Sequence, residues 1–338
     1  LTIHQIMSKI AINGFGRIGR LTFRNLIEND NLEIIAINDL TATDMLAHLL
    51  KYDSAHGRFN GTVSHTESSL IVNGKEITVY AQRDPETLPW GELGIDIVIE
   101  STGFFRDAEG MSKHLKAGAK KVALSAPASG DIKTIVLGVN DTELTAEDTM
   151  VSNASCTTNC LSPMAKVLDE KFGIESGFMC TIHAYTSDQR IQDAPHSDKR
   201  RARAAAMNMI PTSTGAAKAM SLVLPSLKGK LDGTAIRVPT PNVSLIDLTF
   251  VPNKEVTAES INDAMSKAAN GPLKGILATN SAPLVSKDFN HNPHSSIFDL
   301  TQTQVIKGKF SRVLSWYDNE WGFSNRMCDT AIQISKLI

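Results

Sequence analysis

A glycine-rich turn near the start of the chain constrains the fold most. INGFGRIGR at 12–20 follows the apolar run KIAIN at 9–13 and leads into RLTFRNLIEN at 20–29, whose apolar residues recur at helical spacing. The pattern G-x-G-x-x-G between a strand and a helix is typical of a dinucleotide-binding βαβ unit, whereas the same glycines without that context are weak evidence. The sequence therefore predicts such a unit in the first part of the chain.

Each glycine of this turn has its own physical reason. Gly14 permits the tight turn, Gly16 lets the backbone approach a pyrophosphate, and Gly19 lets the helix pack closely on the sheet. The helix start at Arg17 and Ile18 offers free N–H groups and a partial positive charge to the phosphates. These five residues are the predicted phosphate-binding part of a cofactor site.

A carboxylate at the end of the next strand indicates which cofactor binds. Asp39 ends the run EIIAIND and lies twenty positions after Gly19, where it would accept hydrogen bonds from the ribose hydroxyls of an adenosine. Because this carboxylate repels a 2′-phosphate, the sequence favours NAD over NADP. The alternative is a structural glycine turn with a helix-capping aspartate.

The order of the predicted elements indicates two domains, as a length of 338 residues also suggests. In the first half, near-continuous apolar strands alternate with helices, which indicates a Rossmann-type doubly wound parallel sheet covered on both faces, an α/β fold. Beyond it we expect an α+β catalytic domain with a mainly antiparallel sheet. We place the NAD-binding domain at 7–155 and 319–338 and the catalytic domain at 156–318. Periodicity alone leaves open which domain the C-terminal helix contacts.

The individual elements follow from periodicity and turn residues. The predicted strands are 9–13, 33–39, a hairpin over 70–81 with Asn73 and Gly74 in its turn, 96–102, 121–127, 134–140, 150–155, 177–186, 233–239 and 244–252. The predicted helices are 20–29, one from Thr43, 108–119, 156–171 and 320–338.

Composition argues against several classes of protein. A net charge of −2 disfavours nucleic acid or anionic membranes as the main partner. No apolar run approaches the ~18 residues that span a bilayer, and the start LTIHQIM lacks the features of a secretory signal. We therefore expect a cytoplasmic protein with reduced thiols. We also expect the native chain to start at Met7, with residues 1–6 as an upstream extension without function.

The segment ASCTTNC holds two of the four cysteines. Cys156 and Cys160 have ligand-like spacing, but no second pair follows at zinc-finger distance, so no metal is expected. Cys160, Cys180 and Cys328 suit the role of small buried hydrophobic residues. Cys156 opens a predicted helix, whose dipole would lower the thiol pKa and favour the nucleophilic thiolate.

A nucleophilic cysteine needs a base or an ion-pair partner, and His183 in CTIHAYT is the candidate. It lies on the strand that follows the helix of Cys156, and a helix and its neighbouring strand can bring the two together. A single histidine on an apolar strand is more often a hydrogen-bonded core residue. The pairing with Cys156 favours catalysis, although spacing alone does not prove it.

Six segments together resemble the phosphorylating glyceraldehyde-3-phosphate dehydrogenases. They are NGFGRIGR, ASCTTNCLSP, TIHAYT, STGAAKA, IRVPTPNVS and WYDNEWGFSNR, and they occur in this order between Met7 and the C-terminus. The resemblance implies the glycolytic oxidation of D-glyceraldehyde 3-phosphate with NAD and inorganic phosphate to 1,3-bisphosphoglycerate. Cys156 would form a thiohemiacetal and then a thioacyl-enzyme, with His183 stabilising the thiolate, binding the oxyanion and taking the hydroxyl proton.

The resemblance also implies which residues bind the substrates. Those for the substrate phosphate are Thr186 and Arg237, with Asp188 nearby, and those for inorganic phosphate are Ser155, Thr157, Thr214, Gly215 and Arg201. Further cofactor contacts are Arg83 near the adenine, Thr102 and Ser125 at strand ends, and Asn319 on the nicotinamide amide. Without the resemblance, Thr157 and Thr214 would equally be ordinary helix caps.

The basic run DKRRARAA at 198–205 lacks interleaved aromatic residues and lies in a near-neutral chain, which disfavours nucleic acid. In the family this segment lies in a loop that crosses to a neighbouring subunit and lines its NAD site, and Pro195 resembles the NAD-preferring form. The resemblance therefore implies a homotetramer.

Two alternative functions compete with this interpretation. Erythrose-4-phosphate dehydrogenase shares the cysteine, the histidine and the glycine turn but hydrolyses its thioester, and the set Thr157, Thr214 and Arg201 favours phosphorolysis instead. A protein that uses the fold only to hold RNA or a protein partner is disfavoured by the charge.

Overall fold

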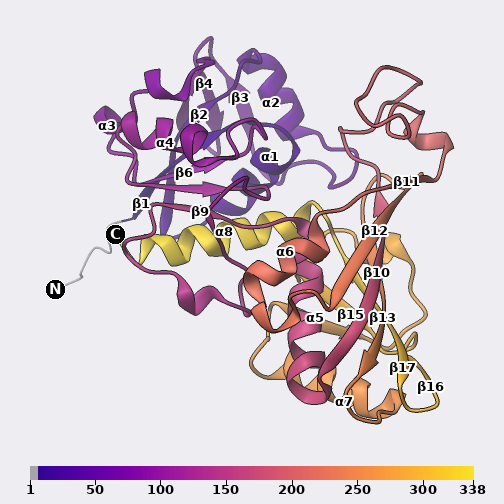
Figure 1. Cartoon of the computed structure of the whole chain (residues 1–338). Coiled ribbons are helices and arrows are strands. Elements are labelled where there is room, and N and C mark those ends of the chain that lie inside the picture. The colour runs from indigo at the N-terminus through magenta and orange to yellow at the C-terminus, as the bar shows by residue number, and fades with distance from the viewer. Residues whose placement is uncertain (1–6) are drawn as a thin grey trace. The chain divides into compact units, whose positions relative to one another are not determined.

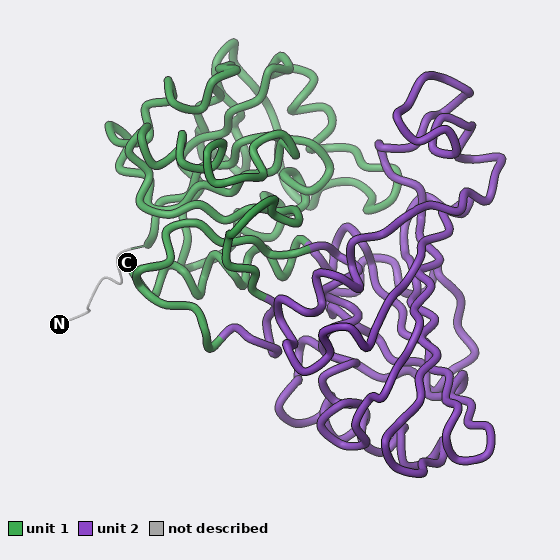
Figure 2. The backbone as a smooth tube through the Cα atoms, in the orientation of Figure 1, with its two compact units in different colours: residues 1–135, 142–154, 324–338 green, residues 136–141, 155–323 purple. Residues whose placement is uncertain are grey.

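The computed structural model describes residues 7–338, and the chain forms two compact units (Figure 2). The predicted upstream extension at 1–6 lies outside the described residues. Unit 1 holds the chain up to Ile135 together with Thr142–Ala154 and Ser324–Ile338, and unit 2 holds Val136–Asp141 and Ser155–Phe323.

Unit 1 is built on a nine-stranded sheet with the order β3-β4-β5-β2-β1-β6-β7-β9-β8 (Figure 1). Its strands are β1 (Ser8–Asn13), β2 (Leu32–Asn38), β3 (Val63–His65), β4 (Ser69–Val72), β5 (Lys75–Tyr80), β6 (Ile97–Glu100), β7 (Lys121–Leu124), β8 (Lys133–Thr134) and β9 (Met150–Ser152). Its helices are α1 (Arg17–Leu26), α2 (Thr43–Lys51), α3 (Trp90–Leu93), α4 (Ala108–Lys116) and most of α8 (Trp321–Ser335). The short 3₁₀ helix η1 (Pro85–Thr87) also belongs to unit 1, and η2 (Asp141–Glu143) begins in unit 2 and ends in unit 1.

Across the sheet, all neighbouring strands from β5 through β2, β1, β6, β7 and β9 to β8 pair in parallel. Antiparallel pairs occur only at one edge, between β3 and β4 and between β4 and β5. The predicted doubly wound parallel sheet is thus confirmed. The predicted hairpin forms as β4 and β5, and its turn residues Asn73 and Gly74 have φ of 52° and 80°, the left-handed values that a tight two-residue hairpin turn requires.

The predicted strand at 134–140 is wrong beyond Thr134. The N–H of Val136 donates to Oδ1 of Asn140, and the N–H of Gly138 donates to Oδ1 of Asp141. Gly138 also has a φ of 77°. Local bonds from these short polar side chains compete with the sheet and turn an apolar run into a tight turn.

The C-terminal helix, whose neighbour the sequence left open, packs in unit 1. Met327, Ala331 and Ile334 are buried in one apolar cluster with Ile10 and Leu26. The spacing of these helical residues gives one apolar face, which the sheet of unit 1 covers.

Unit 2 is built on an eight-stranded mixed sheet with the order β11-β12-β10-β13-β17-β15-β14, and β16 pairs with β17. Its strands are β10 (Ile174–Ala184), β11 (Ile210–Thr212), β12 (Leu231–Val238), β13 (Ser244–Pro252), β14 (Leu277–Asn280), β15 (Ser296–Asp299), β16 (Gln304–Ile306) and β17 (Phe310–Tyr317). Its helices are α5 (Cys156–Phe172), α6 (Ala216–Val223) and α7 (Ala258–Asn270), with 3₁₀ helices η3 (Ala205–Met207), η4 (Pro225–Leu227) and η5 (Ser286–Phe289).

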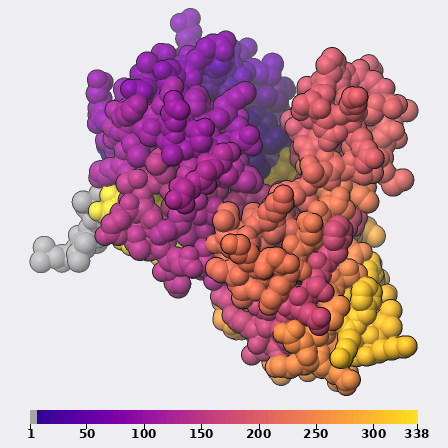
Figure 3. Space-filling model, in the orientation of Figure 1, coloured from indigo at the N-terminus to yellow at the C-terminus, as the bar shows by residue number. Residues whose placement is uncertain are grey.

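Most strand pairs of unit 2 are antiparallel, as expected, but β10 with β12 and β14 with β15 are parallel. Helix α5 packs on the sheet through contacts with β13, β15 and β17. The irregular segment at 187–209 forms a lobe of its own within unit 2 (Figure 3), beyond the ends of β11 and β12 (Figure 1).

No helix within residues 7–338 combines the length and the apolar character needed to span a bilayer.

Candidate active site

The glycine turn between β1 and α1 has the geometry of a phosphate cradle. Gly14 has a φ of 91°, and a Cβ there would lie 2.6 Å from the N atom of Thr102. A Cβ on Gly19 would lie 2.1 Å from the carbonyl oxygen of Gly14, whereas a Cβ on the exposed Gly16 would meet nothing within 4 Å. Gly14 and Gly19 are therefore needed for close packing, while Gly16 leaves open space beside the N-terminus of α1, as a bound pyrophosphate requires.

Most of the predicted cofactor residues lie at one edge of the unit 1 sheet. Gly14, Asp39, Thr102 and Ser125 follow the carboxyl ends of four adjacent parallel strands, β1, β2, β6 and β7. Arg83 is exposed beyond the end of the next strand, β5. Ligands of open α/β sheets bind outside these strand ends, so the residues present fit a dinucleotide.

Asp39 is tied to the glycine turn itself. Its Oδ2 accepts from the N–H of Phe15 at 2.7 Å, and its Oδ1 accepts from the N–H of Thr41 at 2.9 Å. Each oxygen keeps a second lone pair for a ribose hydroxyl. Asn319 is not part of this edge: it belongs to unit 2, where its Oδ1 accepts from the hydroxyl of Ser244 at 2.8 Å.

Arg17, the first residue of α1, holds a buried carboxylate. Its Nη1 and Nη2 donate to the two oxygens of Asp53, whose side chain is only 3% exposed. Burial alone would raise the pKa of Asp53. The bonds from Arg17 and from the N–H groups of His56 and Ala55 outweigh burial and bring the pKa down to about 2. The side chain of Arg17 therefore bonds to Asp53 rather than reaching toward the space beside Gly16.

Replacing Asp53 with asparagine is expected to lower the free energy of unfolding at pH 7 by about 1–2 kcal/mol, less than the full pKa shift implies because Arg17 is partly exposed. The folded-state pKa of about 2 lies below the ~3.9 of an unfolded aspartate. The stabilisation is therefore present above pH ~4, falls to about half by pH 3 and is nearly lost at pH 2. Urea unfolding of both proteins at pH 7 and pH 3 measures this. The exposed Asp131→Asn is the control, and equal midpoints for Asp53→Asn and wild type at pH 7 would contradict the expectation.

The thiol of Cys156 lies at the start of α5. Ser155 is the N-cap, and its hydroxyl accepts from the N–H of Thr158 at 3.0 Å. Ala154, just before the cap, has a φ of 57°, which turns the chain sharply out of the preceding segment into the helix. The Sγ atom of Cys156 lies 3.5 Å from Nε2 of His183 on β10, so the structure brings together the two residues that the sequence could pair only by inference.

Both groups are neutral in this arrangement. Burial raises the pKa of the Cys156 thiol more than the neighbouring Arg237 and the hydrogen bonds from Thr157 lower it. Burial, followed by the charge of Arg237, lowers the pKa of His183 to about 3. The expectation that the helix start alone would leave Cys156 with a lowered pKa is wrong here, because burial disfavours a thiolate more strongly than its surroundings favour it.

The other ring nitrogen of His183 has two neighbours. Nδ1 lies 2.7 Å from the carbonyl oxygen of Ala184 and 2.7 Å from Nη1 of Arg237. Nη1 of Arg237 also donates to this carbonyl oxygen, at 3.0 Å, so the oxygen can accept from both groups. In the tautomer with the proton on Nδ1, Nε2 carries the lone pair and faces the thiol as a base. Parallel pairing of β10 and β12 sets His183 and Arg237 in register, so neighbouring strands position this contact.

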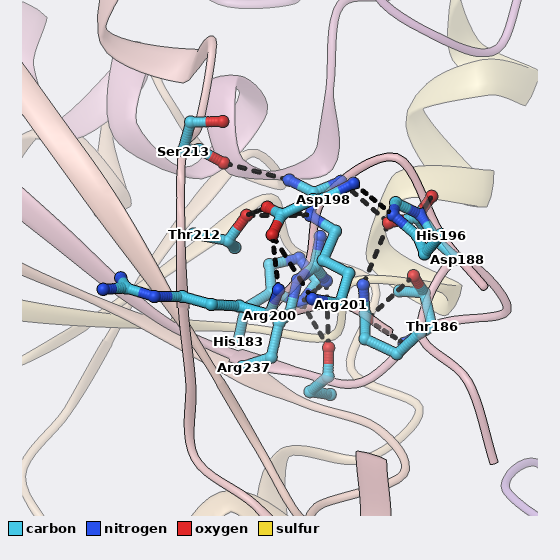
Figure 4. A network of polar contacts seen from close by, with 12 residues as sticks. His183, Thr186, Asp188, His196, Asp198, Arg200, Arg201, Thr212, Ser213 and Arg237 are labelled. Carbon is cyan, nitrogen blue, oxygen red and sulfur yellow. Dashed lines mark hydrogen bonds and ion pairs between the residues drawn. The ribbon is translucent and has the colours of Figure 1, made fainter. Parts of the chain in front are cut away.

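The remaining predicted phosphate residues also belong to unit 2, and the contacts of Arg201 are the most extensive. Arg201 donates to Oδ2 of Asp188 at 2.7 Å, to the hydroxyl of Thr212 at 2.8 Å and to the carbonyl oxygen of Ser213 at 3.2 Å (Figure 4). Burial raises the pKa of Asp188, but Arg201 and His196 lower it by more. The guanidinium of Arg201 is thus held in one orientation, and three of its five N–H groups are used.

Arg237 has a polar atom suited to an anion, whereas both donors of Thr186 already have an acceptor within the protein. The buried Nε of Arg237 has no hydrogen-bond acceptor among residues 7–338. The N–H and hydroxyl of Thr186 both contact Oε1 of Gln189, at 2.9 Å and 3.3 Å. A buried guanidinium donor without an acceptor is what a phosphate oxygen can satisfy.

Thr214 bonds to a backbone N–H at the start of a helix, as a helix cap would, whereas Thr157 does not. The hydroxyl of Thr157 is buried and lies 2.9 Å from the hydroxyl of Tyr317, so it caps nothing. The hydroxyl of Thr214 accepts from the N–H of Ala216 at 3.2 Å, and Gly215 is the N-cap residue of α6. The start of α6 therefore presents backbone N–H groups beside Thr214.

Tyr317 and Glu100 are two buried polar residues that the sequence patterns did not single out. Tyr317 is buried, and its hydroxyl joins Thr157 and Thr181 beside the ring of His183. The one feature of the sequence that could have indicated Tyr317 is its place in WYDNEWGFSNR, a segment that carries the family resemblance. Glu100 follows three apolar residues in β6, and a charged residue closing a buried strand was the available signal.

Within residues 7–338, no three His, Cys, Asp or Glu side chains are arranged to hold a metal ion. All four cysteines are free thiols.

Both units of the chain resemble known proteins. The family model for the NAD binding domain of glyceraldehyde 3-phosphate dehydrogenase matches residues 8–108, and the model for its C-terminal domain matches residues 155–319. The glyceraldehyde-3-phosphate dehydrogenase of Priestia megaterium is 59% identical over 328 residues, which cover 97% of this chain and 98% of that protein. Glyceraldehyde-3-phosphate dehydrogenase 1 of Bacillus subtilis and the enzyme of Geobacillus stearothermophilus are each 58% identical over 97% of this chain and 98% of their own length.

Proposed function

Because the chain belongs to the glyceraldehyde-3-phosphate dehydrogenase family, we propose that it catalyses the glycolytic oxidation of D-glyceraldehyde 3-phosphate with NAD and inorganic phosphate. The product is 1,3-bisphosphoglycerate. The observation that carries this proposal is the 3.5 Å contact between Sγ of Cys156 and Nε2 of His183 at the start of α5. Erythrose-4-phosphate dehydrogenase is not favoured, because the named relatives over nearly the full length are glyceraldehyde-3-phosphate dehydrogenases.

In the first step Sγ of Cys156 attacks the aldehyde carbon, and the thiol proton passes to Nε2 of His183. The neutral state of His183 supports this, because only a neutral ring has a lone pair to accept the proton. The imidazolium then gives this proton to the oxyanion, which becomes a hydroxyl, and His183 is neutral again. In the oxidation step the neutral ring of His183 takes the hydroxyl proton. NAD, when bound, supplies the hydride acceptor for this oxidation.

In the second half, an oxygen of inorganic phosphate attacks the thioester carbon, and the thiolate of Cys156 leaves. We assign the substrate phosphate to Thr186 and Arg237, and inorganic phosphate to Ser155, Thr157, Thr214, Gly215 and Arg201. The unsatisfied Nε of Arg237 and the fixed guanidinium of Arg201 support two anion sites within unit 2. Bound together, the two anions would flank the thioester that Cys156 carries.

We assign NAD binding to unit 1, which holds Gly14, Gly16, Arg17, Ile18, Gly19, Asp39, Arg83, Thr102 and Ser125. A contact of Asn319 with the nicotinamide amide stays a prediction from the family resemblance. Unit 2 is then the catalytic domain, since it holds Cys156 and His183.

The variant Gly16→Val is expected to weaken NAD binding at least about tenfold, because its side chain enters the space where the backbone meets the pyrophosphate. The fold should persist, since a Cβ at Gly16 meets no protein atom within 4 Å. Calorimetric titration with NAD measures the dissociation constant, and thermal unfolding without NAD supplies the control. An unchanged dissociation constant would place the pyrophosphate elsewhere.

We further propose a cytoplasmic homotetramer. Ile191, Met207 and Met209 in the irregular segment of unit 2 are 89%, 84% and 75% exposed, and apolar side chains that are this exposed favour a protein contact. Sedimentation equilibrium tests the assembly, and a monomer at micromolar concentration would refute it.

The direct test of the function follows NADH absorbance with D-glyceraldehyde 3-phosphate and NAD, with and without inorganic phosphate. Turnover that requires phosphate, or arsenate in its place, is the expected result. Turnover that is indifferent to phosphate would indicate a hydrolytic aldehyde dehydrogenase instead.

A further inference from the structure

A buried carboxylate at the carboxyl edge of the unit 1 sheet has no part in the proposed reaction. Glu100 is the last residue of β6, and His114 lies on α4; both are 0% exposed. A charge in such a place is expensive unless several donors compensate for it, so its partners indicate what it does.

Hydrogen-bond chemistry decides the protonation of this pair. Nε1 of Trp90 donates to Nδ1 of His114 at 3.1 Å, and an indole N–H can only donate. Nδ1 is therefore the unprotonated nitrogen, and Nε2 carries the proton that it donates to Oε2 of Glu100 at 3.0 Å. His114 is thus a neutral ring that offers Glu100 a donor in a fixed direction.

The other donors to Glu100 come from two strand ends. Nδ2 of Asn13 donates to Oε2, while the N–H of Thr102, at 2.7 Å, and the hydroxyl of Thr102 donate to Oε1. The amide of Asn13 cannot turn over, because its Oδ1 accepts from Nδ2 of Asn38 at 2.7 Å. Four donors converge on Glu100, and this pattern is satisfied only by an ionised carboxylate.

This network supports the glycine turn directly. A Cβ on Gly14 would lie only 2.6 Å from the N atom of Thr102, so the position of Thr102 limits the space that the turn can occupy. The carbonyl oxygen of Glu100 also accepts from the N–H of Ser125 at 2.9 Å. Glu100 thereby links the ends of β1, β6 and β7, where the proposed cofactor residues lie.

We propose that Glu100 is a positioning residue for the dinucleotide: its carboxylate, oriented by His114 and Trp90, holds Thr102 against Gly14 so that the turn is preformed for the pyrophosphate. The inference rests on the proposed function only in that unit 1 binds NAD. Both donors of Thr102 point to Glu100, so Thr102 itself has only acceptor atoms to offer a ligand. Preforming the turn lowers the ordering entropy that binding would otherwise have to overcome.

The variant Glu100→Gln tests the proposal in the full chain. The NH₂ group of glutamine must replace one of the two carboxylate oxygens, each of which accepts from donors. It therefore displaces either Thr102, which bonds to Oε1, or the pair Asn13 and His114, which bonds to Oε2. NAD titrated by calorimetry without substrate should bind at least about tenfold more weakly. The turnover number at saturating NAD should stay within about threefold, because a positioning residue for binding affects KM more than kcat. Glu92→Gln, an exposed carboxylate on α3, is the matched control and should bind NAD like wild type.

A second variant keeps the test decisive if Glu100→Gln does not fold. Trp90→Phe removes the donor to His114 together with part of a buried ring, leaves Glu100 in place, and should weaken NAD binding at least about threefold. The deciding variant is Glu100→Gln if it folds and Trp90→Phe otherwise. If that variant binds NAD within twofold of wild type, the proposal is overturned. A lower unfolding temperature would not rescue it, because the network would then only stabilise the fold. Wild type that binds NAD but shows no phosphate-dependent turnover would refute the proposed function and leave this test intact.

Discussion

Serine in place of Cys156 is expected to lower phosphate-dependent NADH formation by at least about 10⁴-fold, as removal of a covalent nucleophile does. A hydroxyl is far harder to ionise than a thiol, and its ester would not be the activated thioester that inorganic phosphate can attack. The measurement is steady-state NADH absorbance together with mass spectrometry of the acylated chain. Only the wild type should gain the mass of the acyl group when phosphate is omitted.

Cys160 provides the matched control for this prediction. It lies one helical turn further along α5, is fully buried, and its sulfur lies 3.6 Å from the hydroxyl of Ser296. Burial raises its pKa to about 12, so it is not a nucleophile at neutral pH. Cys160→Ser should keep turnover within about tenfold of wild type, because it makes no covalent bond to substrate. If Cys156→Ser were as active as Cys160→Ser, the proposed nucleophile would be wrong.

Glutamine in place of His183 is expected to slow acylation by about 10²- to 10⁴-fold, the usual contribution of a general base. The amide of glutamine can donate a hydrogen bond toward Sγ but cannot take its proton. Rapid mixing of enzyme, NAD and substrate without phosphate isolates acylation, because the cycle stops at the thioacyl-enzyme. The variant should still bind NAD with nearly the wild-type dissociation constant, since His183 is not among the proposed NAD-binding residues.

The pH dependence of acylation gives an independent check on His183. A folded-state pKa of about 3 means that the ring is neutral from pH ~5 upward. Titration of His183 therefore should not lower the acylation rate between pH 7 and pH 5, and the Cys156 thiol, whose pKa burial raises, titrates above this range. The exposed His65→Gln is the control and should leave the profile unchanged. Acylation by His183→Gln within tenfold of wild type would remove His183 from the mechanism.

Local patterns in the sequence predicted the parts of this molecule that depend on nearby residues. The glycine turn could be read because a tight strand-to-helix turn needs residues without side chains within a few positions of each other. The helix that begins at Cys156 was equally readable, since a serine cap precedes it and Gly173 ends it. The strand predicted at 134–140 failed for the same local reason, because Asn140 and Asp141 bond to the backbone and turn the chain.

Tertiary structure decided what depends on distant partners and on burial. Cys156 and His183 meet because α5 packs on the sheet that contains β10, a contact that spacing along the chain does not encode. The pKa of Cys156 rises rather than falls, since burial depends on everything that surrounds the thiol. Glu100 shows the same division: the sequence places a carboxylate after an apolar strand, but only the fold supplies Asn13, Thr102 and His114 as the donors that keep it charged. The sequence alone determined the identity and order of the chemical groups, whereas the fold determined their protonation states and neighbours, because these depend on distances that only packing sets.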